Sequence, residues 1–238
     1  GDLWRRRGHT DDALALYQQA VDQRPSLFNQ LTLLDAMSEL GQYDRAEALV
    51  ARLRGAHPLS SEVLAVQANL AAAQGQTDRA VDLYRHAIAV QTALTQDSSR
   101  TQLALPQVLL DAGKLDEAAA EIAQVLARQP SDPMAYRLQG DYWHKLRQSE
   151  NAVTAYQRSL ALDPTQIETY IALRNQLRQQ GGRPEALNGL LEAMLARNAG
   201  AASLTIDLGD QRQRVGDTHG AIEAYGEALI KLTALDST

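Results

Sequence analysis

HKLRQSENAVTAYQRSLALDP, residues 144–164, is one of seven copies of a phrase that recurs along this chain. The other copies begin at residues 5, 38, 72, 110, 178 and 213. Each copy contains a turn position, and these positions are Gly8, Gly41, Gly75, Gly113, Arg147, Gly181 and Gly216. Successive turns are separated by 33, 34, 38, 34, 34 and 35 residues. A period near 34 indicates an array of helical repeats.

An alanine follows every turn by five residues. These alanines are Ala13, Ala46, Ala80, Ala118, Ala152, Ala186 and Ala221. Two antiparallel helices joined by a short turn approach most closely just after it, so only a small side chain fits between them. The residues nine and twelve positions after each turn lie on the same helical face as the alanine. Each copy therefore predicts two packed helices.

Local signals mark the ends of the predicted helices. A proline seventeen residues after a turn should end the second helix, because its φ is fixed and it has no N–H; these prolines are Pro25, Pro58, Pro130 and Pro164. The turn glycines favour the left-handed backbone of a helix end. Four side chains are expected to cap second helices, namely Asp44, Asp78, Asp116 and Thr218.

The phrase resembles the tetratricopeptide repeat. In the best copy, residues 133–166, residue types that this family favours stand at Tyr136, Gly140, Trp143, Ala152, Tyr156 and Pro164. The resemblance covers essentially the whole chain and implies an all-α fold, a right-handed α-solenoid of about seven helix-turn-helix repeats. Leu34 and Arg174 stand where the best copy has Gly140, which predicts a slightly different spacing of those helix pairs.

The predicted organisation is a single array over residues 1–238. Its repeats are expected at approximately 1–25, 26–59, 60–97, 98–132, 133–166, 167–200 and 201–235. The first copy lacks the front half of its first helix, and the last copy has no polar capping helix after it. We therefore expect a fragment of a longer chain, or an end that a partner covers.

The 38-residue interval predicts an irregularity between the third and fourth repeats. The second helix of the third repeat should run long, and a polar loop should follow around residues 92–102. Pro106 then falls within the next first helix, where proline costs about 3 kcal/mol or forces a kink. Either that helix begins or bends near Pro106, or the proline marks a hinge or a partner notch.

Composition argues against several classes of function. The formal charge is −6 without a long run of one sign, which disfavours a phosphate-binding surface for nucleic acid. The chain has no cysteine, which is compatible with the cytoplasm and with the periplasm alike. No apolar run approaches the roughly 20 residues of a membrane span. Metal-binding histidine pairs, phosphate loops and nucleophile elbows do not occur, so we expect no catalytic site, cofactor or metal.

The resemblance also implies where a partner would bind. In the tetratricopeptide family the first helices line a concave groove, through positions 13, 10, 6, 3 and 2 residues before each turn. The six-before position always holds an amide or a carboxylate, in Asp2, Asp35, Asn69, Gln107, Asp141, Asn175 and Asp210. We expect Asn69 and Asn175 to clamp the backbone of an extended peptide, since an amide both donates and accepts hydrogen bonds.

Basic groove residues gather in the second half of the chain. They are Arg137, Lys145, Arg178 and Arg214, with His144 close by. Such residues suit a peptide with acidic side chains or a free C-terminus. The particular Lys, Asn, Asn, Lys, Arg set with which the family clamps chaperone C-termini is not matched, which argues against chaperone-tail binding.

Two alternatives to a peptide clamp remain open. Arg137 with Asp141, and Asp210 with Arg214, are i, i+4 pairs that could simply neutralise one another. A partner helix could instead lie on the apolar groove positions, Phe28, Leu31, Leu103, Leu110, Ile171 and Ile206, although these could equally pack between repeats.

We predict an interaction scaffold of a bacterial type. It would recruit a peptide segment or helix of a partner protein during complex assembly, secretion or envelope biogenesis. A second hypothesis makes the array an arm of a larger enzyme, such as a glycosyltransferase, or of an exopolysaccharide export porin. A third is self-association through the uncapped ends.

Overall fold

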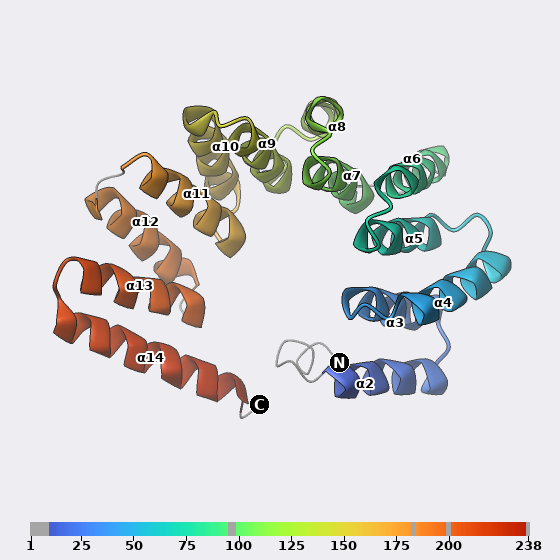
Figure 1. Cartoon of the computed structure of the whole chain (residues 1–238), viewed down its shortest axis with the longest axis horizontal. Helices are drawn as coiled ribbons and strands as arrows, with labels where there is room; N and C mark the ends of the chain where they lie inside the picture. Colours follow the sequence, from blue (N-terminus) through green and yellow to red (C-terminus); the bar gives the residue numbers. More distant parts are fainter. Residues whose placement is uncertain (1–9, 95–98, 182–183, 199–200, 237–238) are drawn as a thin grey trace. The chain divides into compact units, whose positions relative to one another are not determined.

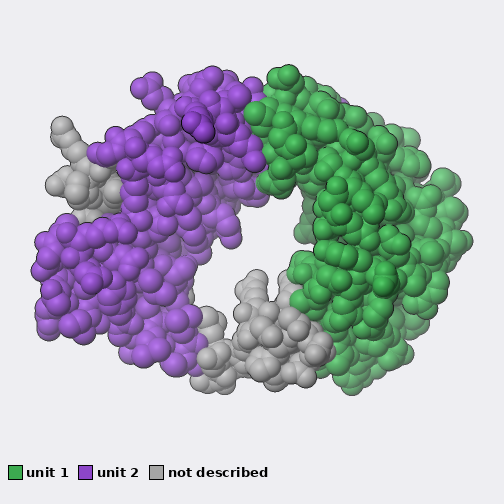
Figure 2. All heavy atoms as spheres, in the orientation of Figure 1, with its two compact units in different colours: residues 1–125 green, residues 126–238 purple. Residues whose placement is uncertain are grey.

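The structure is a computed structural model that describes the backbone of residues 10–94, 99–181, 184–198 and 201–236. All regular structure in these ranges is α-helical (Figure 1). The chain divides into two compact units, residues 1–125 and 126–238, which are coloured separately in Figure 2. Gly8 and Asp2 lie outside the described residues, as do the side chains of Ala13 and Ala186.

The first unit consists of antiparallel helix pairs. Its helices are α2 (Thr10–Gln23), α3 (Leu27–Glu39), α4 (Tyr43–Ala56), α5 (Ser61–Ala73), α6 (Thr77–Ala93), α7 (Ser99–Asp111) and α8 (Leu115–Arg128), and the unit boundary falls in the last turn of α8. α3 packs against α4 and also against α5, and α5 packs against α6. This is the predicted helix-turn-helix arrangement, and the first helices α3 and α5 also contact each other.

The second unit repeats the same arrangement. Its helices are α9 (Pro133–Lys145), α10 (Ser149–Leu162), α11 (Ile167–Gln179), α12 (Pro184–Arg197), α13 (Ala202–Arg214) and α14 (Thr218–Asp236). α9 packs against α10, α10 against α11, and α13 against α14. Its core joins α10 to α11, where Tyr156 and Leu160 pack with Tyr170 and Leu173.

The turns have the backbone that the sequence predicts. Their glycines have φ between 70° and 83°, in Gly41, Gly75, Gly113, Gly181 and Gly216. Arg147 occupies the same position with φ 58°. The close approach after each turn is confirmed as well, because Ala46, Ala80, Ala118 and Ala152 are fully buried and Ala221 is 3% exposed.

The prolines end the second helices as predicted, but the predicted caps are wrong. α2, α4, α8 and α10 each end two residues before a proline. α4 and α6 begin after Gln42 and Gln76, so Asp44 and Asp78 lie inside the first turn, where they favour the helix dipole without capping it. Asp116 likewise lies in the first turn of α8. At α14 the cap is Asp217, whose Oδ1 accepts a hydrogen bond from the Gly220 N–H at 2.9 Å, and Thr218 is the first helical residue.

The irregular third repeat also follows the prediction in part. α6 has 17 residues where α4 has 14, so this second helix does run long. α7 begins at Ser99 and carries Pro106 as a buried residue within it, so the helix does not begin near the proline. Residues 95–98 of the predicted loop lie outside the described ranges. The notch at Pro106 stays a prediction.

The structure also shows that two of the glycines leave room for a tyrosine ring of the facing helix, which the sequence prediction missed. An added Cβ at Gly140 would lie 2.4 Å from the ring of Tyr156, and one at Gly209 would lie 2.5 Å from Tyr225. These glycines stand seven residues before a turn and the tyrosines nine after it, so the ring occupies the space that a side chain would fill.

The residues at these two positions, seven before and nine after the turn, alternate in size from repeat to repeat. Where Leu34, Pro106 and Arg174 stand seven before the turn, the residues nine after it are Val50, Ile122 and Leu190. Leu34 and Val50 share one hydrophobic core. In that repeat the smaller Val50 therefore stands where the Gly140 repeat has Tyr156, and it packs in one core with the larger Leu34.

Candidate functional site

Three described residues that stand six before a turn, Asn69, Asp141 and Asp210, each accept a hydrogen bond from the tyrosine nine residues after that turn. The Tyr156 hydroxyl donates to Asp141 Oδ1 at 2.8 Å, and the Tyr225 hydroxyl to Asp210 Oδ1 at 2.8 Å. The Tyr84 hydroxyl donates in the same way to Asn69 Oδ1. Burial, with a contribution from the Asp35 charge, raises the pKa of Tyr84 to about 12, so its hydroxyl stays a donor at neutral pH.

Asn69 is held at both ends of its amide. Its Nδ2 donates to Asp35 Oδ1 at 3.3 Å, while its Oδ1 accepts from Tyr84. The residue therefore links α5 to α3 and α6. A peptide clamp at Asn69 stays a prediction, and these bonds weigh against it because a peptide would have to replace them.

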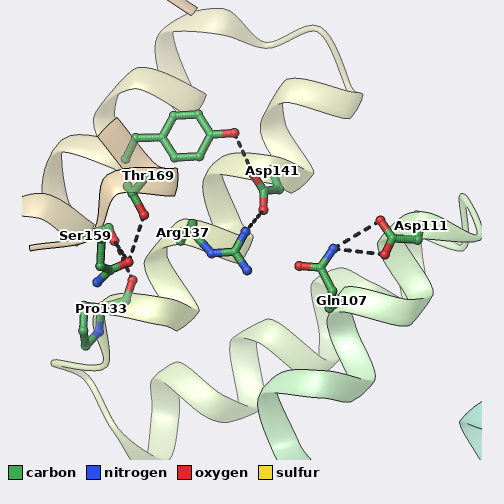
Figure 3. A network of polar contacts seen from close by, with 9 residues as sticks. Gln107, Asp111, Pro133, Arg137, Asp141, Ser159 and Thr169 are labelled. Atoms are coloured by element: carbon green, nitrogen blue, oxygen red, sulfur yellow. Dashed lines mark hydrogen bonds and ion pairs between the residues drawn. The ribbon is translucent and has the colours of Figure 1, made fainter. Parts of the chain in front are cut away.

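Arg137 and Asp141 form the predicted i, i+4 ion pair at 2.8 Å (Figure 3). The other predicted pair, Asp210 with Arg214, is not formed within the described residues; Asp210 accepts from Tyr225 instead. In the first unit, Gln107 donates to Asp111 at 3.1 Å, also shown in Figure 3. The described acidic residues that stand six before a turn, Asp35, Asp141 and Asp210, thus each make a contact within the chain.

His144 contacts the next repeat, and its role in partner binding stays a prediction. Its Nδ1 lies 2.7 Å from Gln176 Oε1, and Gln176 Nε2 donates to Ser149 Oγ at 2.6 Å. Gln176 is buried, so these two bonds satisfy its amide. Lys145 and Arg214, which are also basic groove residues of this unit, are exposed.

One groove in the first unit brings predicted positions together. It has a volume of about 330 Å³ and lies over α3, α5 and α7, with α6 behind. Its lining includes positions 13, 10 and 6 before the turns at Gly41 and Gly75, in the residues Phe28, Leu31, Asp35, Glu62, Ala65 and Asn69. The Phe28 side chain is 76% exposed. We call this cavity the first-unit groove.

The apolar groove positions do not all reach the surface. Ile206 is 39% exposed, and Leu31, Leu103 and Ile171 are half-buried. Leu110 has no exposed surface and is a core residue, so its predicted place in the groove is wrong. It stands three residues before the turn at Gly113.

The second unit contains a buried carboxylate that the sequence prediction missed. Asp207 on α13 has a side chain 4% exposed and accepts from the Tyr170 hydroxyl at 2.5 Å. It also pairs with Arg174 Nη1 at 2.8 Å and with Arg178 Nη2 at 3.3 Å. Burial alone would raise the pKa of Asp207, but hydrogen bonds from Arg174 and Tyr170 and the charges of both arginines hold it below its usual value.

A signal for Asp207 is present in the sequence. It stands nine residues before its turn, and the corresponding residues of the other repeats are Thr32, Val66, Ala104, Leu138 and Ala172. An acidic residue at a position that is otherwise uncharged needs a partner when buried. Arg174 is that partner, at a position where the other repeats carry uncharged residues, namely glycine, alanine, leucine or proline.

The ten predicted site residues fall into two sets. Asn69 and Gln107 belong to the first unit, and Arg137, Asp141, His144, Lys145, Asn175, Arg178, Asp210 and Arg214 belong to the second. Among the described residues, no cluster of His, Cys, Asp or Glu has an arrangement that could hold a metal ion. No helix in the described ranges combines the length and apolarity needed to cross a membrane.

Comparison with known proteins relates these repeats to one family. Two family models, both described as tetratricopeptide repeat, match residues 103–167 and 5–70, which together make up more than half of the chain. No curated protein sequence matches the chain.

Solved structures share the fold at low sequence identity. A tetratricopeptide repeat protein from Parabacteroides merdae is 12% identical with a TM-score of 0.60, covering 96% of this chain and 89% of its own. A thermophilic TPR protein of Thermus thermophilus is 18% identical with a TM-score of 0.61, covering 73% and 93%. The protein MamA is 19% identical with a TM-score of 0.54, covering 72% and 97%. These likenesses show the fold alone.

Proposed function

The chain belongs to the tetratricopeptide repeat family, and from that premise we propose that it binds a peptide segment or a helix of a partner protein on its first helices. Proteins with this fold generally serve as interaction scaffolds and not as catalysts. The processes that we propose for this scaffold are complex assembly, secretion or envelope biogenesis.

The first-unit groove is the observation that carries the proposal. Three consecutive first helices contribute to it, and residues from the same repeat positions line it one after another. Phe28 and Leu31 give the groove an apolar end, while Asp35 and Asn69 place hydrogen-bonding groups beside them. A partner segment with apolar side chains on one face would bury Phe28.

The experiment is site-specific photocrosslinking in the native host. A photoreactive phenylalanine analogue replaces Phe28 in one variant and Leu59 in the other. Leu59, in the connection between α4 and α5, is 75% exposed and so matches Phe28 in accessibility without lining the groove. We expect a discrete crosslinked protein from position 28 and none from position 59. Equal crosslinking at both positions, or none at either, would contradict the proposal.

Self-association remains a separate prediction. Ile222 and Leu229 on α14 are 65% and 62% exposed. Their counterparts two repeats earlier, Val153 and Leu160, pack in the core with α11. Light scattering over a wide concentration range tests it, and a monomer at every concentration would eliminate it.

A further inference from the structure

A second cleft in the first unit lies apart from the first-unit groove. It lies between the second helices α2 and α4, and the first helix α3 contributes to its lining (Figure 1). Its volume is about 660 Å³, against about 330 Å³ for the first-unit groove, and the two cavities share no lining residue. Small-molecule sites typically enclose roughly 300–1,000 Å³. We call this cavity the α2–α4 cleft.

The α2–α4 cleft combines apolar side chains with a positively charged surface. Four core residues that are 3% to 5% exposed border it, namely Leu33, Met37, Leu49 and Leu53. Beside them on α4, Ala48 and Ala56 are exposed and leave the cleft open. The charged lining residues are all exposed, and they are Arg45, Arg52 and Asp22, which leaves one net positive charge. A matching occupant therefore has an apolar body and an anionic group.

The next cleft along the same unit shows which group Arg45 lacks. That cleft lies between α4 and α6 and has a volume of about 210 Å³. Arg79 lines it, four residues after its turn as Arg45 is, and pairs with Glu47 of α4 at 3.8 Å. Glu47 also accepts a hydrogen bond from Gln74 at 3.1 Å. The buried Leu14 stands at the repeat position of Glu47, so Arg45 lacks the corresponding carboxylate.

Both arginines of the α2–α4 cleft are available to an anion. Arg45 Nη1 donates to Gln42 Oε1 at 2.6 Å, but Arg79 makes the same bond to Gln76 and still pairs with its carboxylate. Arg52 forms no hydrogen bond or ion pair in the part of the chain that the structure describes. The two arginines are seven residues apart, so they lie on one face of α4, about 10 Å apart along the helix.

We propose that the α2–α4 cleft binds a small carboxylic acid with an unbranched aliphatic chain. The carboxylate contacts Arg45 as Glu47 contacts Arg79 in the next cleft, and Arg52 adds a second positive charge. The aliphatic chain lies against the leucines and the methionine of the cleft, which removes apolar surface from water. This site goes beyond the proposed function, because neither its residues nor its ligand belong to the first-unit groove.

The test is a titration of the full chain with its methionine methyl groups labelled with ¹³C. Met37 borders the α2–α4 cleft. Met194 borders the corresponding cleft between α10 and α12, of about 240 Å³, and Met134 lies on α9 and borders neither. The probes are hexanoate, octanoate and decanoate, with acetate and octanol as controls. Met37→Leu identifies the Met37 resonance, which we expect to shift saturably while the other two do not.

The affinity should depend on both parts of the probe. Each added methylene should tighten binding about two- to fourfold, because it buries further apolar surface. Octanol, which lacks the charge, should bind about three- to tenfold more weakly than octanoate, as expected for the loss of one charge-assisted hydrogen bond. Acetate, which lacks the chain, should give no saturable shift.

Three variants test the charges of the cleft. Arg45→Gln should weaken octanoate binding about three- to tenfold and leave octanol binding unchanged. Asp22→Asn removes a negative charge from the lining and should strengthen octanoate binding about twofold. Arg128→Gln changes the net charge as Arg45→Gln does, but Arg128 is exposed in the last turn of α8 and does not line the cleft. This control should bind octanoate as wild type does.

Several results would overturn the inference. They are equal shifts of all three methionines, affinities that do not rise with chain length, tighter binding of octanol than of octanoate, or equal effects of Arg45→Gln and Arg128→Gln. The titration uses no partner protein, and the crosslinking from Phe28 uses no carboxylic acid, so either proposal can fail without the other.

Discussion

Replacing Gly140 by alanine should destabilise the repeat that contains α9 and α10, although alanine favours helices. The new Cβ would lie 2.4 Å from Tyr156 Cδ1 and Cε1, about 1 Å short of the roughly 3.5 Å at which carbon atoms ordinarily touch. Tyr156 is 2% exposed and its hydroxyl is bonded to Asp141, so the ring cannot swing away freely.

The expected magnitude follows from three opposing effects. Overpacking a core costs about 1–3 kcal/mol, and weakening the hydroxyl bond to a carboxylate adds about 1.5 kcal/mol. The gain in helix propensity returns about 1 kcal/mol. We expect a net loss of about 2 kcal/mol in the free energy of unfolding.

The assay is urea unfolding combined with amide hydrogen exchange, because repeats can open locally. The loss of protection should centre on α9 and α10. Gly189→Ala in α12 is the matched control, since its Cβ would meet nothing within 4 Å; it should stabilise the chain by about 0.5–1 kcal/mol. If both variants were equally stabilised, the packing of Tyr156 against Gly140 would be refuted.

Three further perturbations test other parts of the structure. Tyr156→Phe should lower the free energy of unfolding in urea by about 1.5 kcal/mol. This value is at the low end for a hydrogen bond to a carboxylate, because Asp141 keeps its ion pair with Arg137. An unchanged unfolding midpoint would show that the bond from Tyr156 to Asp141 does not stabilise the fold. Arg147→Gly should stabilise by about 0.5–1 kcal/mol, because arginine is strained at φ 58°, and a loss of stability would contradict this. Asp207→Asn should cost about 2 kcal/mol at pH 7, since it leaves Arg174 and Arg178 without their carboxylate. The stabilisation by Asp207 is present above its unfolded pKa of about 4 and disappears as pH falls through the lower folded pKa. The difference in the free energy of unfolding between wild type and Asp207→Asn should therefore shrink on acidification. A difference that stays constant with pH would exclude the charge as its cause.

Features written within one repeat can be predicted from the sequence. The turn at Arg147 follows from its register although it lacks glycine, and Pro164 marks the end of α10 because proline acts locally. The predicted cap at Asp44 is wrong because a cap can be assigned only where the helix boundary is known to the residue.

Features that depend on contacts between helices cannot be read in the same way. The bond from Tyr156 to Asp141 joins residues 15 apart on facing helices, whereas the repeat register alone indicates only a groove position for Asp141. The contact of Arg178 with Asp207 spans 29 residues and joins first helices of neighbouring repeats. A repeat alignment shows that Asp207 is unusual, but only the packing of α11 beside α13 shows which side chains neutralise it.

The most direct test of the central claim is the affinity of the segment that crosslinks to position 28. Fluorescence anisotropy with the labelled segment would compare wild type with Phe28→Ala and Leu59→Ala. Burying a phenylalanine is worth about 1.5–3 kcal/mol, so Phe28→Ala should weaken binding about tenfold or more, while Leu59→Ala should bind as wild type does. Equal affinity in all three proteins would contradict binding in the first-unit groove.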